Sequence, residues 1–209
     1  MRTKMGCPSG TARTTQMADS KNSPSTEAQW KVRSTKVHFE NKIMRLKEDH
    51  LQLPDGSEMD YAFIERGPAV IVVPVTPDGR IILIRQFRHP AREECLEVPA
   101  GTARDAQGMS LEEVAAKELK EEVGVRFARI ESVGKFFSNP SLCDEECEAF
   151  IAFGAEIVQR PEQEQGEEIE TILVPIAEAM VMARAGKVRT GPAALALFLA
   201  EPRLSQGSF

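Results

Sequence analysis

Three glutamates stand close together in a segment with the sequence signals of a helix: Glu118, Glu121 and Glu122. At 100° per residue, their side chains gather on one side of such a helix. Glu118 and Glu122 are four residues apart, and like charges at this spacing destabilise a helix by about 0.2–0.5 kcal/mol. A hard divalent cation such as Mg²⁺, which prefers oxygen ligands, would relieve this repulsion. The alternative is an acidic helix face that is simply solvated.

The same segment carries the signals that begin and end a helix. Ser110 can accept a hydrogen bond from the first turn, and Glu113, three residues later, can bond back to the Ser110 N–H. Gly124 supplies the left-handed residue that commonly ends a helix. An apolar stripe suited to packing on a sheet consists of Ala115, Ala116, Leu119 and Val123. The sequence therefore predicts a helix over residues 111–123 with its glutamates beside a buried stripe.

Strands and further helices surround this segment. Turn residues at 53–56 separate two extended runs, so residues 36–65 predict short strands. A Pro-Asp-Gly turn at 77–79 predicts a hairpin of two buried strands. The remaining apolar patterns predict strands near 127–137, 149–153 and 169–174, and helices at 176–185 and 192–200.

The length and composition are those of one folded unit preceded by a tail. The chain has 209 residues, of which 42% are hydrophobic and 28% charged, enough for a sizeable core. Residues 1–30 contain no Leu, Ile, Val or Phe and are expected to be a disordered tail. The basic, acid-free start faintly resembles an organelle transit peptide but lacks an apolar helical face. We expect N-terminal strands at 31–66, which could form a dimer, and the main domain at 67–205.

The charge and the cysteine content limit which binding partners and which cellular compartment are expected. A net charge of −6 argues against nucleic acid or an anionic membrane as the main partner. The sequence has neither an apolar run long enough to span a membrane nor a secretory signal. Four cysteines are too few for a disulfide scaffold, so reduced thiols are expected. These features favour a soluble, cytoplasmic protein.

The helix segment resembles the catalytic half of the Nudix box. Residues 117–125 read Lys-Glu-Leu-Lys-Glu-Glu-Val-Gly-Val, where the family has Arg-Glu-aliphatic-x-Glu-Glu-x-Gly-aliphatic. The upstream half departs from the family pattern, because Met109 stands where the family has Glu and Ala103 where it has Gly. Gly101 lies two residues earlier, so the loop is longer. That Glu and the box Arg form a structural ion pair in the family, and both partners are changed here, to Met109 and Lys117.

Two more segments resemble the ADP-ribose pyrophosphatase branch of the Nudix hydrolases. They are Ile-Arg-Gln-Phe-Arg at 84–88 followed by Glu-Val-Pro-Ala-Gly at 97–101, and the loop at 138–146, similar to Ser-Pro-Gly-x-x-Asp-Glu. The resemblance covers about residues 36–202. It implies an α+β fold, a Nudix α/β/α sandwich with a mixed β-sheet, preceded by a small N-terminal antiparallel β region.

The resemblance also implies roles for particular residues. The expected ligands of Mg²⁺ (or Mn²⁺) are the carbonyl of Ala100 and the side chains of Glu118, Glu121 and Glu122. The expected substrate-binding residues are Arg85, Arg88 and Pro140. Arg88 is the candidate diphosphate clamp, since a guanidinium donates paired hydrogen bonds to phosphate. Its alternative is a surface ion pair with Glu93 or Glu94.

Three carboxylates are candidates for catalysis: Glu97, Glu121 and Glu145. The motif places the general base, or a ligand of a metal-bound water, at Glu145, with Asp144 and Glu146 as close competitors. The alternative for this acidic turn is a solvent-facing loop. Glu97 has two alternative roles: it orients a water or supports the metals, or it is only the carboxylate at the end of a strand.

The implied activity is metal-dependent hydrolysis of a nucleoside diphosphate linked to another moiety, with ADP-ribose giving AMP and ribose 5-phosphate. Other sugar nucleotides, dinucleotides and nucleoside triphosphates are alternative substrates. A catalytically weak nucleotide-binding domain is the alternative of another class, suggested by Met109 and Lys117. The branch also implies a homodimer whose N-terminal strands contribute to the site. Trp30 either stacks on adenine or only packs at the edge of the fold.

Overall fold

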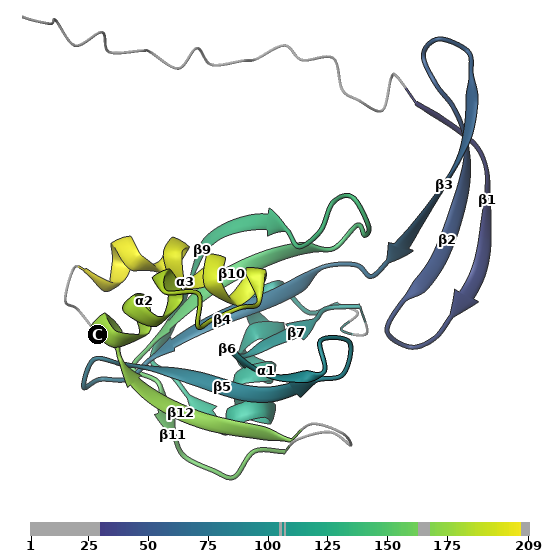
Figure 1. Cartoon of the computed structure of the whole chain (residues 1–209). Coiled ribbons are helices and arrows are strands. Elements are labelled where there is room, and N and C mark those ends of the chain that lie inside the picture. Colours follow the sequence, from purple (N-terminus) through teal and green to yellow (C-terminus); the bar gives the residue numbers. More distant parts are fainter. Residues whose placement is uncertain (1–29, 105, 107, 163–167, 206–209) are drawn as a thin grey trace, which may run out of the picture.

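The chain forms a small antiparallel sheet, followed by a larger mixed sheet that has helices on both faces (Figure 1). The computed structural model describes residues 30–104, 106, 108–162 and 168–205. The tail expected at residues 1–30 lies outside this part of the chain, except for Trp30.

The small sheet contains β1 (Lys31–Glu40), β2 (Arg45–Gln52) and β3 (Glu58–Glu65) in that order. Both neighbouring pairs are antiparallel, and the chain reverses between β2 and β3 in the predicted turn at 53–56. The sheet extends away from the rest of the molecule, and β3 leads into the larger sheet (Figure 1). The predicted N-terminal antiparallel region is therefore confirmed.

The larger sheet has seven strands, with the central order β12-β5-β4-β10-β9, β6 beside β5 and β7 beside β4. Its strands are β4 (Ala69–Val75), β5 (Arg80–Arg88), β6 (Glu93–Glu97), β7 (Ala100–Thr102), β9 (Arg129–Phe137), β10 (Glu146–Phe153) and β12 (Ile169–Pro175). The pair β4–β10 is parallel and the other pairs are antiparallel, so the sheet is mixed, as predicted. A separate two-stranded ribbon joins β8 (Val125–Arg126) to β11 (Glu156–Ile157).

Helices cover both faces of this sheet. Alternate residues of β4 face opposite sides, because side chains alternate along a strand. Val70 and Val72 pack in the core formed with α1 (Leu111–Val123), whereas Ile71 and Val73 pack in the core formed with α2 (Ile176–Arg184) and α3 (Gly191–Leu204). This arrangement is the predicted α/β/α sandwich. No helix in the described part of the chain is long and apolar enough to cross a membrane.

Helix α1 has the predicted boundaries. The Ser110 hydroxyl accepts a hydrogen bond from the Glu113 N–H, and the Glu113 carboxylate accepts one from the Ser110 N–H, which completes the capping box. Gly124 ends the helix with φ +66°. A Cβ at this position would overlap the backbone carbonyl oxygen of Gln159, so close packing also requires glycine here. The sequence signals therefore determine where the three glutamates stand.

Candidate active site

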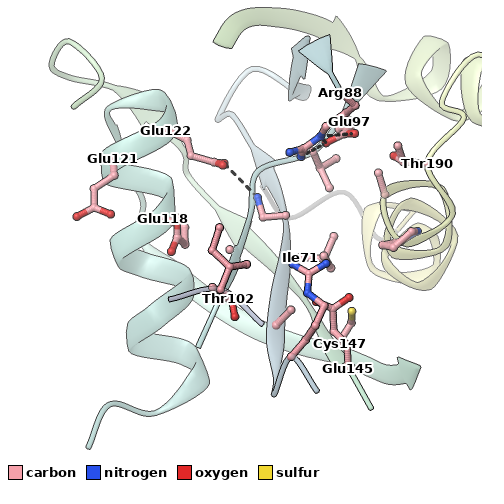
Figure 2. Close-up of a pocket in the computed structure, with 18 of the residues that line it drawn as sticks. Ile71, Arg88, Glu97, Thr102, Glu118, Glu121, Glu122, Glu145, Cys147 and Thr190 are labelled. Atoms are coloured by element: carbon pink, nitrogen blue, oxygen red, sulfur yellow. Dashed lines mark hydrogen bonds and ion pairs between the residues drawn. The ribbon is translucent and has the colours of Figure 1, made fainter. Parts of the chain in front are cut away.

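A cavity of about 800 Å³ opens at the edge of the sandwich, between α1, β7 and the start of α3. It brings together all but two of the predicted site residues: Arg88, Glu97, Ala100, Glu118, Glu121, Glu122 and Glu145. Figure 2 shows α1 with its glutamates on one side of this cavity and Glu97, Glu145 and Thr190 on other sides. Its size is in the range of about 300–1,000 Å³ typical of ligand pockets.

Glu118 and Glu122 of α1 are packed against β7. Glu122 is 5% exposed, and its carboxylate accepts a hydrogen bond of 3.1 Å from the Ala100 N–H. A Cβ on Gly101 would overlap the Glu118 carboxyl group, so this glycine makes room for that side chain. Glu121 extends away from Glu122 in Figure 2 and forms an ion pair of 2.8 Å with Lys117.

The oxygen donors on α1 suit a hard divalent cation. Among the described residues, no group of three or more His, Cys, Asp or Glu side chains is gathered as a ready metal site. Carboxylates of α1 nevertheless line the same cavity as Ala100, and oxygen atoms are the ligands that Mg²⁺ prefers. The space that Gly101 leaves for the Glu118 carboxylate brings this donor against β7. The residues present therefore fit such an ion.

Arg88 is held by Glu97. The Glu97 carboxylate, 4% exposed, accepts hydrogen bonds from Nε at 3.1 Å and from Nη2 at 2.5 Å. These bonds raise the pKa of Arg88, although burial opposes the shift. Among the described residues no ion pair joins Arg88 to Glu93 or Glu94, the alternative partners, and Glu93 pairs instead with Arg189 at 2.6 Å. No hydrogen bond among the described residues uses Nη1 of Arg88, so this end of the guanidinium can donate to a phosphate oxygen.

The three consecutive acids that the sequence left open have different surroundings. Glu145 lines the cavity, is 8% exposed and has its carboxylate 3.0 Å from Nε of Arg66. Asp144 lines a second, more polar cavity and accepts hydrogen bonds from the backbone of Arg66 and Gly67. Glu146 begins β10 and is exposed. Of the three, Glu145 is the one that lines the cavity shared with the glutamates of α1.

A thiol also lines the cavity wall. Burial, together with the nearby charge of Glu145, raises the pKa of Cys147 to about 12. A thiol with this pKa is protonated at neutral pH, whereas the nucleophilic form of cysteine is the thiolate. Cys147 is therefore a poor nucleophile at neutral pH.

The structure leaves two predicted residues outside the cavity. Arg85 points along the exposed side of β5 and pairs with Glu170 at 2.5 Å. Pro140 is exposed in the loop between β9 and β10. Neither is among the residues that line the cavity, so their contact with a substrate stays a prediction.

Sequence reasoning missed several cavity residues. Arg66 comes from the junction between the two sheets, and Thr190, whose buried hydroxyl has no hydrogen-bond partner among the described residues, precedes α3. Lys42 and Ile43 come from the turn between β1 and β2. Arg66 stands directly before Gly-Pro, where a strand must end, and this was the available signal for a junction.

Known proteins share this architecture. The chain matches the family described as "NUDIX domain" over residues 65–194 and the one described as "Nucleoside diphosphate sugar hydrolase N-terminal domain" over residues 30–64. An ADP-ribose pyrophosphatase of Bacillus subtilis is 28% identical over 160 residues, which cover 76% of this chain and 85% of that protein. An ADP-ribose pyrophosphatase of Mycobacterium tuberculosis is 32% identical over 138 residues, which cover 66% of each chain.

A solved structure agrees with the sequence matches. The crystal structure of an ADP compounds hydrolase superposes with a TM-score of 0.72 at 23% identity, covering 87% of this chain and 97% of that one. At this identity the likeness shows the shared fold. The match to the NUDIX domain, however, spans more than half of the chain. The chain therefore belongs to the Nudix hydrolase family.

Proposed function

We propose that this protein hydrolyses the diphosphate bond of a nucleoside diphosphate linked to another moiety, with ADP-ribose as the substrate, giving AMP and ribose 5-phosphate. The observation that carries the proposal is the single cavity shared by the acidic face of α1, the Arg88–Glu97 pair and Glu145. Two relatives are named ADP-ribose pyrophosphatase, which supports this choice of substrate.

Each group in the cavity has a chemical task in this reaction. Water attacks one phosphorus of the diphosphate, and the Glu145 carboxylate accepts its proton as general base. Arg88 donates hydrogen bonds to the phosphate oxygens, while Glu97 fixes the orientation of the guanidinium. Glu145 and Arg88 are therefore the catalytic and phosphate-binding residues of the proposal.

We propose Mg²⁺, or Mn²⁺ in its place, as the cofactor. Glu118, Glu121 and Glu122 would hold it, with the Ala100 carbonyl as a backbone ligand. A bound divalent ion lowers the pKa of a coordinated water and offsets charge on the phosphoryl oxygens. Of these ligands, Glu121 already has a charge partner, because it forms an ion pair of 2.8 Å with Lys117.

A kinetic panel tests the substrate class. We expect kcat/KM for ADP-ribose to exceed that for any simple nucleoside triphosphate at least about tenfold, a difference of about 1.4 kcal/mol. Other sugar nucleotides belong in the panel, because the N-terminal match is described for nucleoside diphosphate sugars. Glu122→Gln should lower turnover at least about tenfold at saturating Mg²⁺. A triphosphate as best substrate would overturn the substrate class, and unchanged turnover of Glu122→Gln would overturn the metal role.

We propose that a second copy of this chain covers the N-terminal sheet, formed by residues 31–66, and that residues 67–205 form the hydrolase domain. The edge strand β1 is exposed along its whole length, and Phe39 on it is 49% exposed. A long unpaired strand edge with exposed apolar residues tends to associate with another chain. Phe39→Asp should convert a dimer into a monomer in analytical ultracentrifugation. A wild-type chain that sediments as a monomer at all concentrations would contradict this arrangement.

The cysteines suggest where the protein works. Cys95, Cys143 and Cys147 are free thiols. Free thiols persist in reducing compartments, so we propose the cytoplasm. Fractionation of cells that express the tagged protein tests this assignment.

A further inference from the structure

The loop that carries Glu145 is joined to the end of β3. The Ile64 N–H donates to the Leu142 carbonyl at 2.8 Å, and the Asp144 N–H donates to the Ile64 carbonyl at 3.3 Å. Ile64 and Cys143 form a parallel β-bridge. Backbone bonds from the N-terminal sheet therefore fix the path of this loop just before it reaches Glu145.

Side-chain contacts extend this junction toward the cavity. The Asp144 carboxylate accepts a hydrogen bond of 2.7 Å from the Arg66 N–H and a longer one of 3.4 Å from the Gly67 N–H. The next residue, Glu145, lies on the cavity side, and its carboxylate is 3.0 Å from Nε of Arg66. Arg66 thus contacts one acid through its backbone and the other through its side chain.

The pair between Arg66 and Glu145 depends on this placement. A buried carboxylate needs a charge partner, and Arg66 is the ion-pair partner that the described residues give to Glu145. The contact lacks the alignment of a hydrogen bond, and Nε of Arg66 is buried with no hydrogen-bond partner in the described part of the chain. Charge, rather than a directed bond, holds the Glu145 carboxylate, so loss of the Arg66 guanidinium would leave this buried carboxylate without its ion-pair partner.

We infer that Arg66 and Asp144 are positioning residues for the reaction: Asp144 fixes the junction against the loop, and Arg66 holds the Glu145 carboxylate at the cavity wall. This inference rests on the proposed function, in which Glu145 accepts the proton from water. It gives the N-terminal sheet a part in catalysis within its own chain, because the junction that positions Glu145 is the end of β3.

Matched variants test the inference in the full chain. Arg66→Gln and Asp144→Ala should each lower kcat for ADP-ribose at least about tenfold and change KM less than about threefold, since the substrate-binding groups stay in place. Asp144→Asn keeps an acceptor oxygen for the backbone N–H groups and should retain kcat within about threefold. Arg80→Gln is the control, because Arg80 also has an ion pair and a buried, unbonded Nε but lies at the start of β5, outside the cavity. Its kcat should match the wild type.

A double-mutant cycle separates positioning from a direct role. In a Glu145→Gln background, Arg66→Gln and Asp144→Ala should cause less than about a threefold further loss, because residues that act through one group are not additive. Full, additive losses in that background would overturn the inference, as would an Asp144→Asn variant as slow as Asp144→Ala.

A Glu145→Gln variant with wild-type kcat would instead overturn the proposed role of Glu145 as general base. Amide hydrogen exchange then tests whether Asp144 anchors the loop to the end of β3. Asp144→Ala should speed exchange at Ile64 and Asp144→Asn should not, and equal exchange in both variants would overturn the anchoring role.

Discussion

Replacing Gly101 by alanine tests how closely β7 and α1 are packed at the cavity. A Cβ at residue 101 would overlap the Glu118 carboxyl group, well inside the ordinary contact distance of 3.4 Å. Gly101 has no positive φ, so alanine suits the backbone and the strain falls on the Glu118 side chain. The carboxyl group must move by at least about 1 Å, and a displacement of about 1 Å in an active site can cost on the order of a hundredfold in rate.

We therefore expect Gly101→Ala to lower kcat/KM for ADP-ribose by roughly 10- to 100-fold and to weaken Mg²⁺ binding, measured by titration of the metal. Because the Glu118 side chain is flexible, the loss of folding free energy, measured by denaturant titration, should be about 1 kcal/mol. Gly191→Ala is the control, since a Cβ there meets no other atom and Gly191 is not among the cavity residues. Wild-type activity and metal affinity in Gly101→Ala would refute the placement of Glu118.

Two further predictions concern ion pairs. Arg88→Ala removes the partner of the buried Glu97, so we expect a loss of about 1–2 kcal/mol of stability and at least a tenfold fall in kcat/KM. Adding Glu97→Gln to this variant should restore the melting temperature but not the activity. A restored activity would contradict the role of Arg88 as diphosphate clamp. The hydrogen bond from Lys47 holds the pKa of Glu65 below its usual 4.5, although burial opposes the shift. A carboxyl group whose pKa is lowered in the folded state adds stability above its unfolded pKa, and this stability is lost as the pH falls through the folded pKa. The difference in melting temperature between wild type and Glu65→Gln should therefore shrink below about pH 4, and a difference independent of pH would contradict this assignment.

The sequence was sufficient where local chemistry determines structure. The capping box at Ser110 and the left-handed Gly124 place α1 to the residue, because caps act through neighbouring backbone groups. β4 is buried at every residue, and its successive side chains enter opposite cores because side chains alternate along a strand. These features, with the box on α1, were enough to predict the fold and the acidic side of the cavity.

Long-range contacts were not predictable in the same way. The partner of Arg88 is Glu97 rather than Glu93, because the neighbouring loop supplies Arg189 to Glu93. The pairing of Arg66 with Glu145 joins residues far apart in sequence, and no local pattern marks it. Three consecutive acids look equivalent in the sequence, and only the junction with β3 distinguishes Asp144 from Glu145.

Product analysis tests the central claim most directly. The purified chain is incubated with ADP-ribose and Mg²⁺, and the products are identified by phosphorus NMR and mass spectrometry, with a chelator-treated sample as the control. The account predicts AMP and ribose 5-phosphate in equal amounts, formed by the addition of one water across the diphosphate, and no product with chelator. Intact ADP-ribose in the presence of Mg²⁺, or products that retain the diphosphate bond, would contradict it.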